Sequence, residues 1–227
     1  MPRLHTDREF EGELTALRER LLLMGGHIEE MIAGAITAAV TGDVVLARAT
    51  MAKDRAVDQD ELDVDERCLR IMARRQPVGP DLRFVAFAFK IVTDLERMGD
   101  LATSICRRVI EVEEGGAGPA EEVAKLGESA REMVHLALDA FANSDAASAR
   151  KVLELDDAVD DLYHELFRAM LAEMALGSAN IGRSVRLQNI AKQLERIGDH
   201  ATNVAEQVVF LVSGKDVRHR GRPSADR

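Results

Sequence analysis

Four pairs of acidic residues stand out in the sequence, because the two members of each pair are four residues apart. The pairs are Asp54/Asp58, Glu96/Asp100, Asp156/Asp160 and Glu195/Asp199. Residues at this spacing lie on one face of a helix, where two carboxylates repel each other by about 0.2–0.5 kcal/mol. A bound cation would turn this repulsion into attraction, so the spacing indicates a metal site. Carboxylate oxygens suit Mg, Ca, Mn or iron, and they suit zinc less well.

The acidic pairs also belong to an internal repeat. The sequence LERMGD at 95–100 recurs as LERIGD at 194–199, and the segment at 54–58 recurs at 156–160. In each half the two pairs are equally far along the chain from a predicted turn, which lies near Pro77 in the first half and near Gly177 in the second. An antiparallel helix pair brings such positions to the same level. We therefore expect two clusters of four carboxylates, each at the solvent edge of an apolar seam.

The elements that carry these pairs are predicted to be helices. Prolines occur only at positions 2, 77, 80, 119 and 223, and apolar residues recur at steps of three and four between them. This pattern predicts six helices, over 10–31, 46–72, 84–112, 123–141, 152–174 and 190–212. We expect an all-α fold of two tandem, sequence-related three-helix bundles of long antiparallel helices. The first bundle spans 1–115 and the second 119–214, each with its own core, and a disordered tail follows at 215–227.

Composition excludes several function classes. The chain has 227 residues, 46% of them hydrophobic, which is enough for a folded core. A net charge of −10 and an aromatic content of 4% argue against nucleic-acid binding. No uninterrupted apolar run has the length of a membrane span, so we expect a cytoplasmic protein without membrane insertion. Cys68 and Cys106 follow apolar helical patterns and are interpreted as buried hydrophobic residues.

Other interpretations of the acidic pairs stay open. The carboxylates could form an ordinary solvated helix face. A carboxylate-bridged di-iron enzyme would need Glu-x-x-His on paired helices, and only Glu132 and His135 have that form, without a counterpart. His200 is interpreted as a surface residue or a neighbour of the ligands. Gly99 and Gly198 would allow either close helix packing or room for an ion.

Two stretches resemble the PhoU family of phosphate-specific transport accessory regulators. Residues 74–83 (RRQPVGPDLR) and 94–100 (DLERMGD) resemble the first half of these proteins, and 194–206 (LERIGDHATNVAE) resembles the second. The resemblance implies a non-enzymatic negative regulator of phosphate uptake and of the phosphate-starvation response. Its expected partners are the ATPase subunit of the phosphate ABC transporter, the phosphate sensor histidine kinase and a second copy of the chain.

The same resemblance implies multinuclear iron or zinc, or another divalent cation, at the paired acidic motifs. The alternative function is a carboxylate-bridged metal-binding protein or metalloenzyme on a helical-bundle scaffold. No organic cofactor and no catalytic residue is expected.

Overall fold

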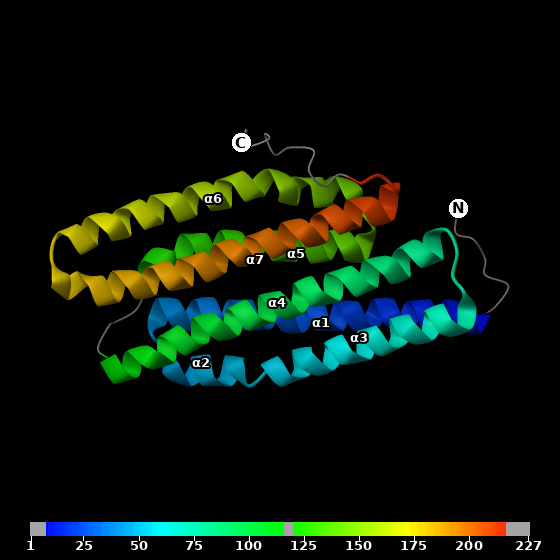
Figure 1. Cartoon of the computed structure of the whole chain (residues 1–227), viewed down its shortest axis with the longest axis horizontal. Coiled ribbons are helices and arrows are strands. Elements are labelled where there is room, and N and C mark those ends of the chain that lie inside the picture. The colour runs from blue at the N-terminus through cyan, green and yellow to red at the C-terminus, as the bar shows by residue number, and fades with distance from the viewer. Residues whose placement is uncertain (1–7, 116–119, 217–227) are drawn as a thin grey trace.

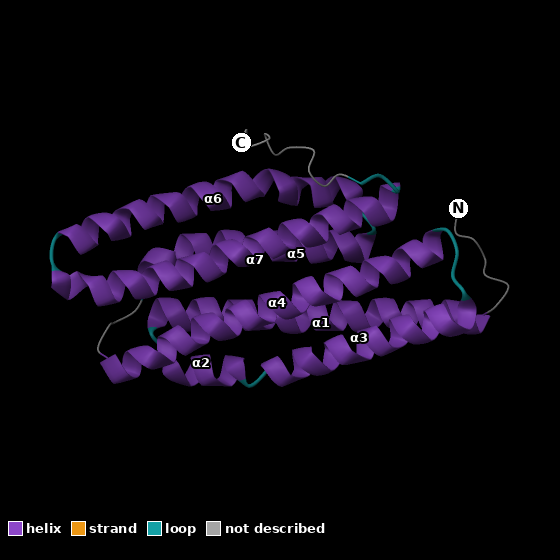
Figure 2. Cartoon of the chain, viewed as in Figure 1, coloured by secondary structure: helices purple, strands orange, loops and turns teal. Residues whose placement is uncertain are grey.

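A computed structural model describes residues 8–115 and 120–216, and every regular element in these residues is a helix (Figures 1 and 2). Seven α-helices follow one another, with a short 3₁₀ helix before the fifth and another before the seventh. They are α1 (Arg8–Thr41), α2 (Val44–Met51), α3 (Asp54–Arg75), α4 (Pro80–Gly115), η1 (Glu121–Val123), α5 (Ala124–Asn143), α6 (Ala146–Ala175), η2 (Ser178–Asn180) and α7 (Ile181–Ser213). The all-α prediction is confirmed.

Helix α1 shows how the apolar spacing becomes structure. Leu17, Leu21 and Ile28 lie on the stripe predicted from the sequence, and each is fully buried. The helix ends at Thr41 and is followed by Gly42, whose φ of 71° is strained for residues with a side chain. Asp43 then caps α2, because its side chain accepts a hydrogen bond from the backbone N–H of Leu46 at 2.9 Å.

The predicted single helix over 46–72 is wrong, because the chain breaks at Ala52 and Lys53 between α2 and α3. The backbone tightens there: the Lys53 N–H donates to the Thr50 carbonyl and the Ala56 N–H to the Lys53 carbonyl, both three residues back. Neither glycine nor proline marks this position in the sequence. Thr50 is buried against Gly34 of α1, so tertiary packing accompanies the break.

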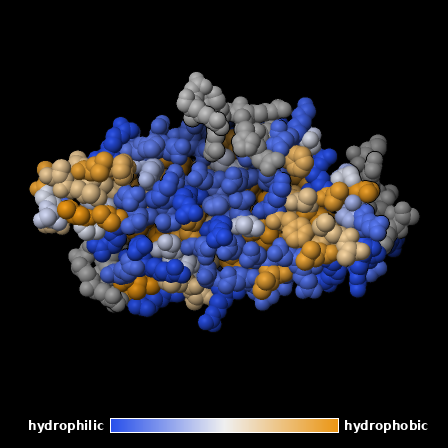
Figure 3. Space-filling view, viewed as in Figure 1, coloured by the Kyte–Doolittle hydropathy of each residue, from blue (hydrophilic) through white to orange (hydrophobic). Residues whose placement is uncertain are grey.

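The two halves pack along their length through α1 against α5 and α4 against α7 (Figure 1). Their buried side chains form one continuous apolar cluster, so the expectation of a separate core in each half is wrong. Hydrophilic residues cover the middle of the face seen in Figure 3.

The contact between α1 and α5 repeats with the duplication. A Cβ atom added to Gly25 would meet the Leu138 side chain, and one added to Gly127 would meet that of Ile36. Gly25 and Gly127 are 102 residues apart, as are Ile36 and Leu138. This is the separation of the repeated acidic segments, so the two copies contact each other with approximate two-fold symmetry.

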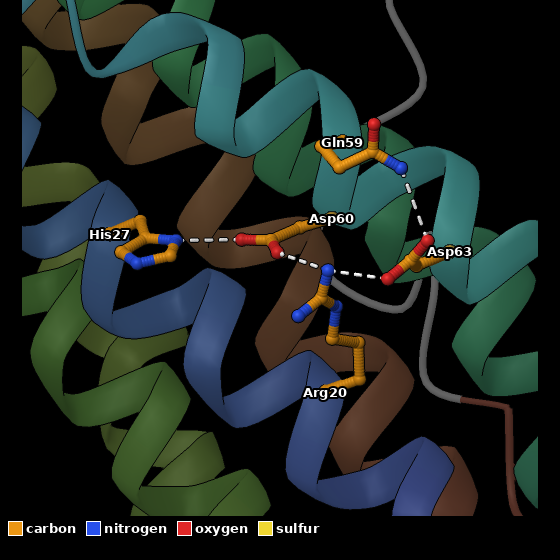
Figure 4. A network of polar contacts seen from close by, with 5 residues as sticks. All are labelled: Arg20, His27, Gln59, Asp60 and Asp63. Atoms are coloured by element: carbon orange, nitrogen blue, oxygen red, sulfur yellow. Dashed lines mark hydrogen bonds and ion pairs between the residues drawn. The ribbon is translucent and has the colours of Figure 1, made fainter.

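An ionic network around the buried Asp60 joins α1 to α3 (Figure 4). The Asp60 side chain is only 3% exposed, and its carboxylate lies 3.1 Å from Arg20 and 2.7 Å from His27. Arg20 also pairs with Asp63, which accepts a hydrogen bond from Gln59. Leu162 occupies the position of Asp60 in the second half, so the network belongs to the first half alone.

Helix α1 is long enough and apolar enough, by length and composition, to cross a membrane. Half of its most apolar window is buried inside the protein, and a core helix has the same composition. The predicted tail at 215–227 lies outside the described residues except for Lys215 and Asp216, and the predicted linker at 115–119 lies outside them except for Gly115.

Candidate metal centres in the two halves

The structure brings the first two acidic pairs together between α3 and α4. Asp54 and Asp58 lie on α3, and Asp100 lies on α4. Partial burial raises the pKa of Asp54, and the negative charges of Asp58 and Asp100 raise it further. The pKa of Glu96 is also raised, first by burial and then by the charge of Asp100. Because each carboxylate acts on the pKa of another, the four carboxylates lie close together between α3 and α4.

The second half repeats this arrangement between α6 and α7. Burial raises the pKa of Asp199, and the charges of Glu195, Asp156 and Asp160 add to that effect. The pKa of Asp160 is raised by burial and then by the charge of Glu195. All four predicted residues of the second half therefore also lie in one cluster.

A threonine supports the first aspartate of each cluster. Thr103 donates a hydrogen bond to Asp54 at 3.2 Å, and Thr202 donates one to Asp156 at 3.0 Å. Each threonine stands seven residues after the glutamate of its own helix, which is two turns along the same face. Sequence reasoning missed both residues, although this repeated spacing could have identified them.

The two clusters differ in charge. The first gains the carboxylate of Glu61, whose pKa is raised by burial and by the charges of Asp65 and Asp58. In the second, Tyr163 stands at the position of Glu61, and the ammonium group of Lys192 lies 5.2 Å from its ring centre. Lys192 also bonds to Glu195 at 2.6 Å. In the first cluster Arg97 lies 3.2 Å from Asp100, so each cluster holds one paired basic side chain, and the carboxylate of Glu61 makes the first cluster the more negative of the two.

The donor atoms suit a hard cation. Both clusters offer carboxylate oxygens, and the Glu195 side chain, only 12% exposed, has a buried Oε2 atom without a hydrogen-bond partner. A cation would satisfy that oxygen and would relieve the repulsion among the carboxylates, which adds to burial in raising their pKa values. Among the described residues, no three His, Cys, Asp or Glu side chains are already arranged to hold an ion. Binding would therefore require the carboxylates to rotate toward each other.

Gly99 and Gly198 face apolar neighbours. A Cβ atom at Gly99 would lie 3.2 Å from Ile28, and one at Gly198 would lie 3.4 Å from Val159. The three nearest heavy atoms at each glycine belong to aliphatic or methionine side chains. Of the two interpretations, close helix packing is the one that these contacts favour.

Two histidines pair with carboxylates of the other half. His200 of α7 lies 2.8 Å from Asp94 of α4, with both side chains 19% exposed. His135 of α5 lies 2.7 Å from Glu29 of α1, which raises the pKa of the imidazole. The interpretation of His200 as a surface residue or a neighbour of the ligands is corrected by its contact with Asp94 of the other half.

Both cysteines are fully buried, and burial raises the pKa of the Cys68 and Cys106 thiols to about 12. Thiols with such pKa values stay protonated at neutral pH and are poor nucleophiles and metal ligands. Their interpretation as small core residues is confirmed.

The duplicated architecture matches a known family. The PhoU domain model matches residues 21–109 and matches again at 123–208, so each copy contains one acidic cluster. The chain belongs to the PhoU family. A PhoU homolog from Pseudomonas putida, named a phosphate-specific transport system accessory protein, is 42% identical over 219 residues. That alignment covers 96% of this chain and 86% of the relative.

PhoU proteins from other bacteria agree with this assignment. The phosphate-specific transport system accessory protein PhoU of Escherichia coli K12 is 35% identical over 98% of this chain and 93% of its own length. The crystal structure of PhoU from Pseudomonas aeruginosa superposes with a TM-score of 0.87 at 40% identity, covering 91% of this chain and all of that one. The phosphate transport system regulatory protein PhoU from Streptococcus pneumoniae gives 0.82 at 28% identity, covering 92% and 99%.

Proposed function

We propose that this PhoU-family protein regulates phosphate-specific transport. The observation that carries the proposal is the match of two PhoU domains within one chain, to relatives that are named for this transport system over nearly their full length. The crystal structures that superpose on it include that of a phosphate transport system regulatory protein.

The finer proposal is a negative regulator without enzymatic activity. The protein would suppress phosphate uptake and the phosphate-starvation response by linking the ATPase subunit of the phosphate ABC transporter to the phosphate sensor histidine kinase. It would act in the cytoplasm as a homodimer. The approximate two-fold packing of its halves supports a linking role, because one rigid body then presents two related surfaces.

Deleting the gene tests the regulatory role. A reporter driven by a phosphate-starvation promoter should become active at high phosphate in the deletion strain, and the full-length chain should restore repression. Repression that persists in the deletion strain would contradict the proposal. Such a result would favour the alternative, a carboxylate-bridged metal-binding protein or metalloenzyme, which predicts bulk metal loading or redox turnover instead.

We also propose that the acidic clusters bind divalent or trivalent cations, with multinuclear iron or zinc as the leading candidates. The first cluster would use Asp54, Asp58, Glu96 and Asp100, and the second Asp156, Asp160, Glu195 and Asp199. The partnerless Glu195 oxygen and the raised pKa values support this role. A bound cation would neutralise each cluster and clamp its two helices together.

Metal analysis tests this assignment. Protein purified without chelator should lose about half of its metal in Asp100→Ala and about half in Asp199→Ala, because each variant removes a ligand from one of two clusters. Glu154→Ala is the matched control, since Glu154 is an exposed carboxylate of α6 outside the clusters. Equal metal content in the wild-type protein and in all three variants would contradict the assignment of the acidic clusters as metal sites.

A further inference from the structure

The second acidic cluster contains a cation that belongs to the chain itself. The Lys192 ammonium group donates a hydrogen bond to the Glu195 carboxylate at 2.6 Å and lies 5.2 Å from the centre of the Tyr163 ring. Lys192 and Glu195 belong to α7, whereas Tyr163 belongs to α6. The ammonium group therefore lies where the two helices that carry the cluster meet, and the face of the ring attracts it there.

The positive charge of Lys192 acts on three of the four carboxylates of its cluster. Burial acts to lower the pKa of Lys192, but the bond to Glu195 and the surrounding negative charges raise it overall. Burial and neighbouring carboxylates raise the pKa of Asp160 and of Asp199, and the charge of Lys192 opposes both increases. The ammonium group thus does part of what a bound cation would do.

The first cluster differs at both of these positions. Thr93 stands at the position of Lys192, 99 residues earlier, and Glu61 stands at the position of Tyr163, 102 residues earlier. These are the separations of the repeated acidic segments. Where the second cluster has an ammonium group against an aromatic ring, the first has a hydroxyl group and a fifth carboxylate.

The basic side chain of the first cluster lies at an exposed position. Arg97 is 3.2 Å from Asp100, whose side chain is 51% exposed. Glu195, the partner of Lys192, is 12% exposed, and its Oε2 atom is buried without a hydrogen-bond partner. A cation that binds either oxygen of Glu195 would lie close to the ammonium group, so Lys192 must leave the carboxylate or repel the cation.

We propose that Lys192 is the internal counter-ion of the second cluster, and that a divalent cation must displace it to bind there. The second cluster is then the weaker of the two cation sites, and the two copies of the repeat fill one after the other as the cation concentration rises. This inference rests on the cation-binding role proposed above, and it adds a residue outside the acidic pairs that sets the affinity.

Titrations of the chelator-treated, full-length chain with Mn²⁺ test the proposal, followed by calorimetry and by the electron paramagnetic resonance signal of free Mn²⁺. Asp100→Ala leaves the second cluster intact, Asp199→Ala leaves the first intact, and the former should bind Mn²⁺ more weakly. Adding Lys192→Gln to the Asp100→Ala chain should tighten its binding about tenfold, because a full positive charge is removed. Adding Lys192→Arg instead should keep the weaker binding, because the charge is kept.

Arg97→Gln in the Asp199→Ala chain is the matched control. It also removes a positive charge beside a cluster, but from an exposed ion pair, so the affinity for Mn²⁺ should change less than about threefold. Melting temperatures give a second measurement. Without metal, Lys192→Gln alone should melt below the wild-type protein, because Glu195 loses its partner, and Mn²⁺ should then raise the melting temperature more in this variant than in the wild type.

The results distinguish this inference from the metal assignment on which it rests. Unchanged affinity after Lys192→Gln, or an equal gain after Arg97→Gln, would overturn the role of Lys192 and leave the acidic clusters as metal sites. A wild-type chain that binds neither Mn²⁺ nor Zn²⁺ would overturn both.

Discussion

Replacing the buried Asp60 tests how the first half holds α3 in place. We predict that Asp60→Leu lowers the free energy of unfolding by about 2–3 kcal/mol. Removing one partner from a buried ion pair costs about 3–5 kcal/mol, because the other charge is left uncompensated. The cost here should fall at or below the lower end, since the Arg20 and His27 side chains keep 23% and 32% of their exposure. Arg20 also retains Asp63.

The assay is urea unfolding followed by circular dichroism, with the slope of the transition compared between proteins to confirm that the denatured states match. A loss of this size should lower the melting temperature by about 4–12 °C in a chain of this length. Asp63→Asn is the control, because its carboxylate is 32% exposed and its loss should cost less than about 1 kcal/mol.

A second variant shows whether the loss of stability comes from the unpaired charges or from the different shape of the leucine side chain. The triple change Arg20→Met/His27→Leu/Asp60→Leu should recover most of the stability, since an apolar replacement of a whole buried ionic network is often neutral. Leu162 at the equivalent position of the second half shows that the fold accepts leucine there. A loss below about 0.5 kcal/mol in Asp60→Leu, or a triple variant no more stable than the single one, would refute this reasoning.

Three further predictions concern packing and pH. Gly34→Ala should destabilise the protein by about 1–3 kcal/mol, because its Cβ would overlap the buried Thr50 side chain. Gly198→Ala should instead stabilise it by up to about 1 kcal/mol, because alanine has the higher helix propensity. Urea midpoints that shift in the same direction in both variants would contradict this pair of predictions. Asp199→Asn should raise the melting temperature of chelator-treated protein at pH 7, because the raised pKa of Asp199 means that its charged form opposes folding. This increase in melting temperature should fade as the pH drops toward 3.8, the ordinary pKa of an aspartate. An increase that grows as the pH drops would contradict the prediction. His135→Ala should destabilise the protein at pH 6 but not at pH 9. The pKa of His135 is raised above 6.5 by its bond to Glu29, and the ion pair is lost as the pH rises through this raised pKa. Equal losses of stability at both pH values would contradict this role of His135.

The positions of proline and the period of the apolar residues were sufficient to predict the long helices, because both act locally along the chain. The convergence of Asp54 and Asp58 with Glu96 and Asp100 followed from one further rule, that equal distances from a turn meet in an antiparallel pair. The break at Ala52 was not predictable in this way, since no helix-breaking residue marks it, and the packing of the neighbouring Thr50 against Gly34 of α1 is a contact that no local pattern shows.

Contacts between the halves were also beyond the reach of sequence patterns. The pairing of His200 with Asp94 joins residues 106 positions apart, and no spacing rule connects α4 to α7. The continuous core has the same origin, since apolar periodicity shows which face of a helix is buried but not which helix covers it.

Direct binding of the two expected partners tests the central proposal most closely. The purified full-length chain should bind both the ATPase subunit of the phosphate transporter and the cytoplasmic part of the phosphate sensor kinase, and a three-component complex should sediment faster than either pair. A chain that binds neither protein, with and without added iron or zinc, would contradict its role as the link between them.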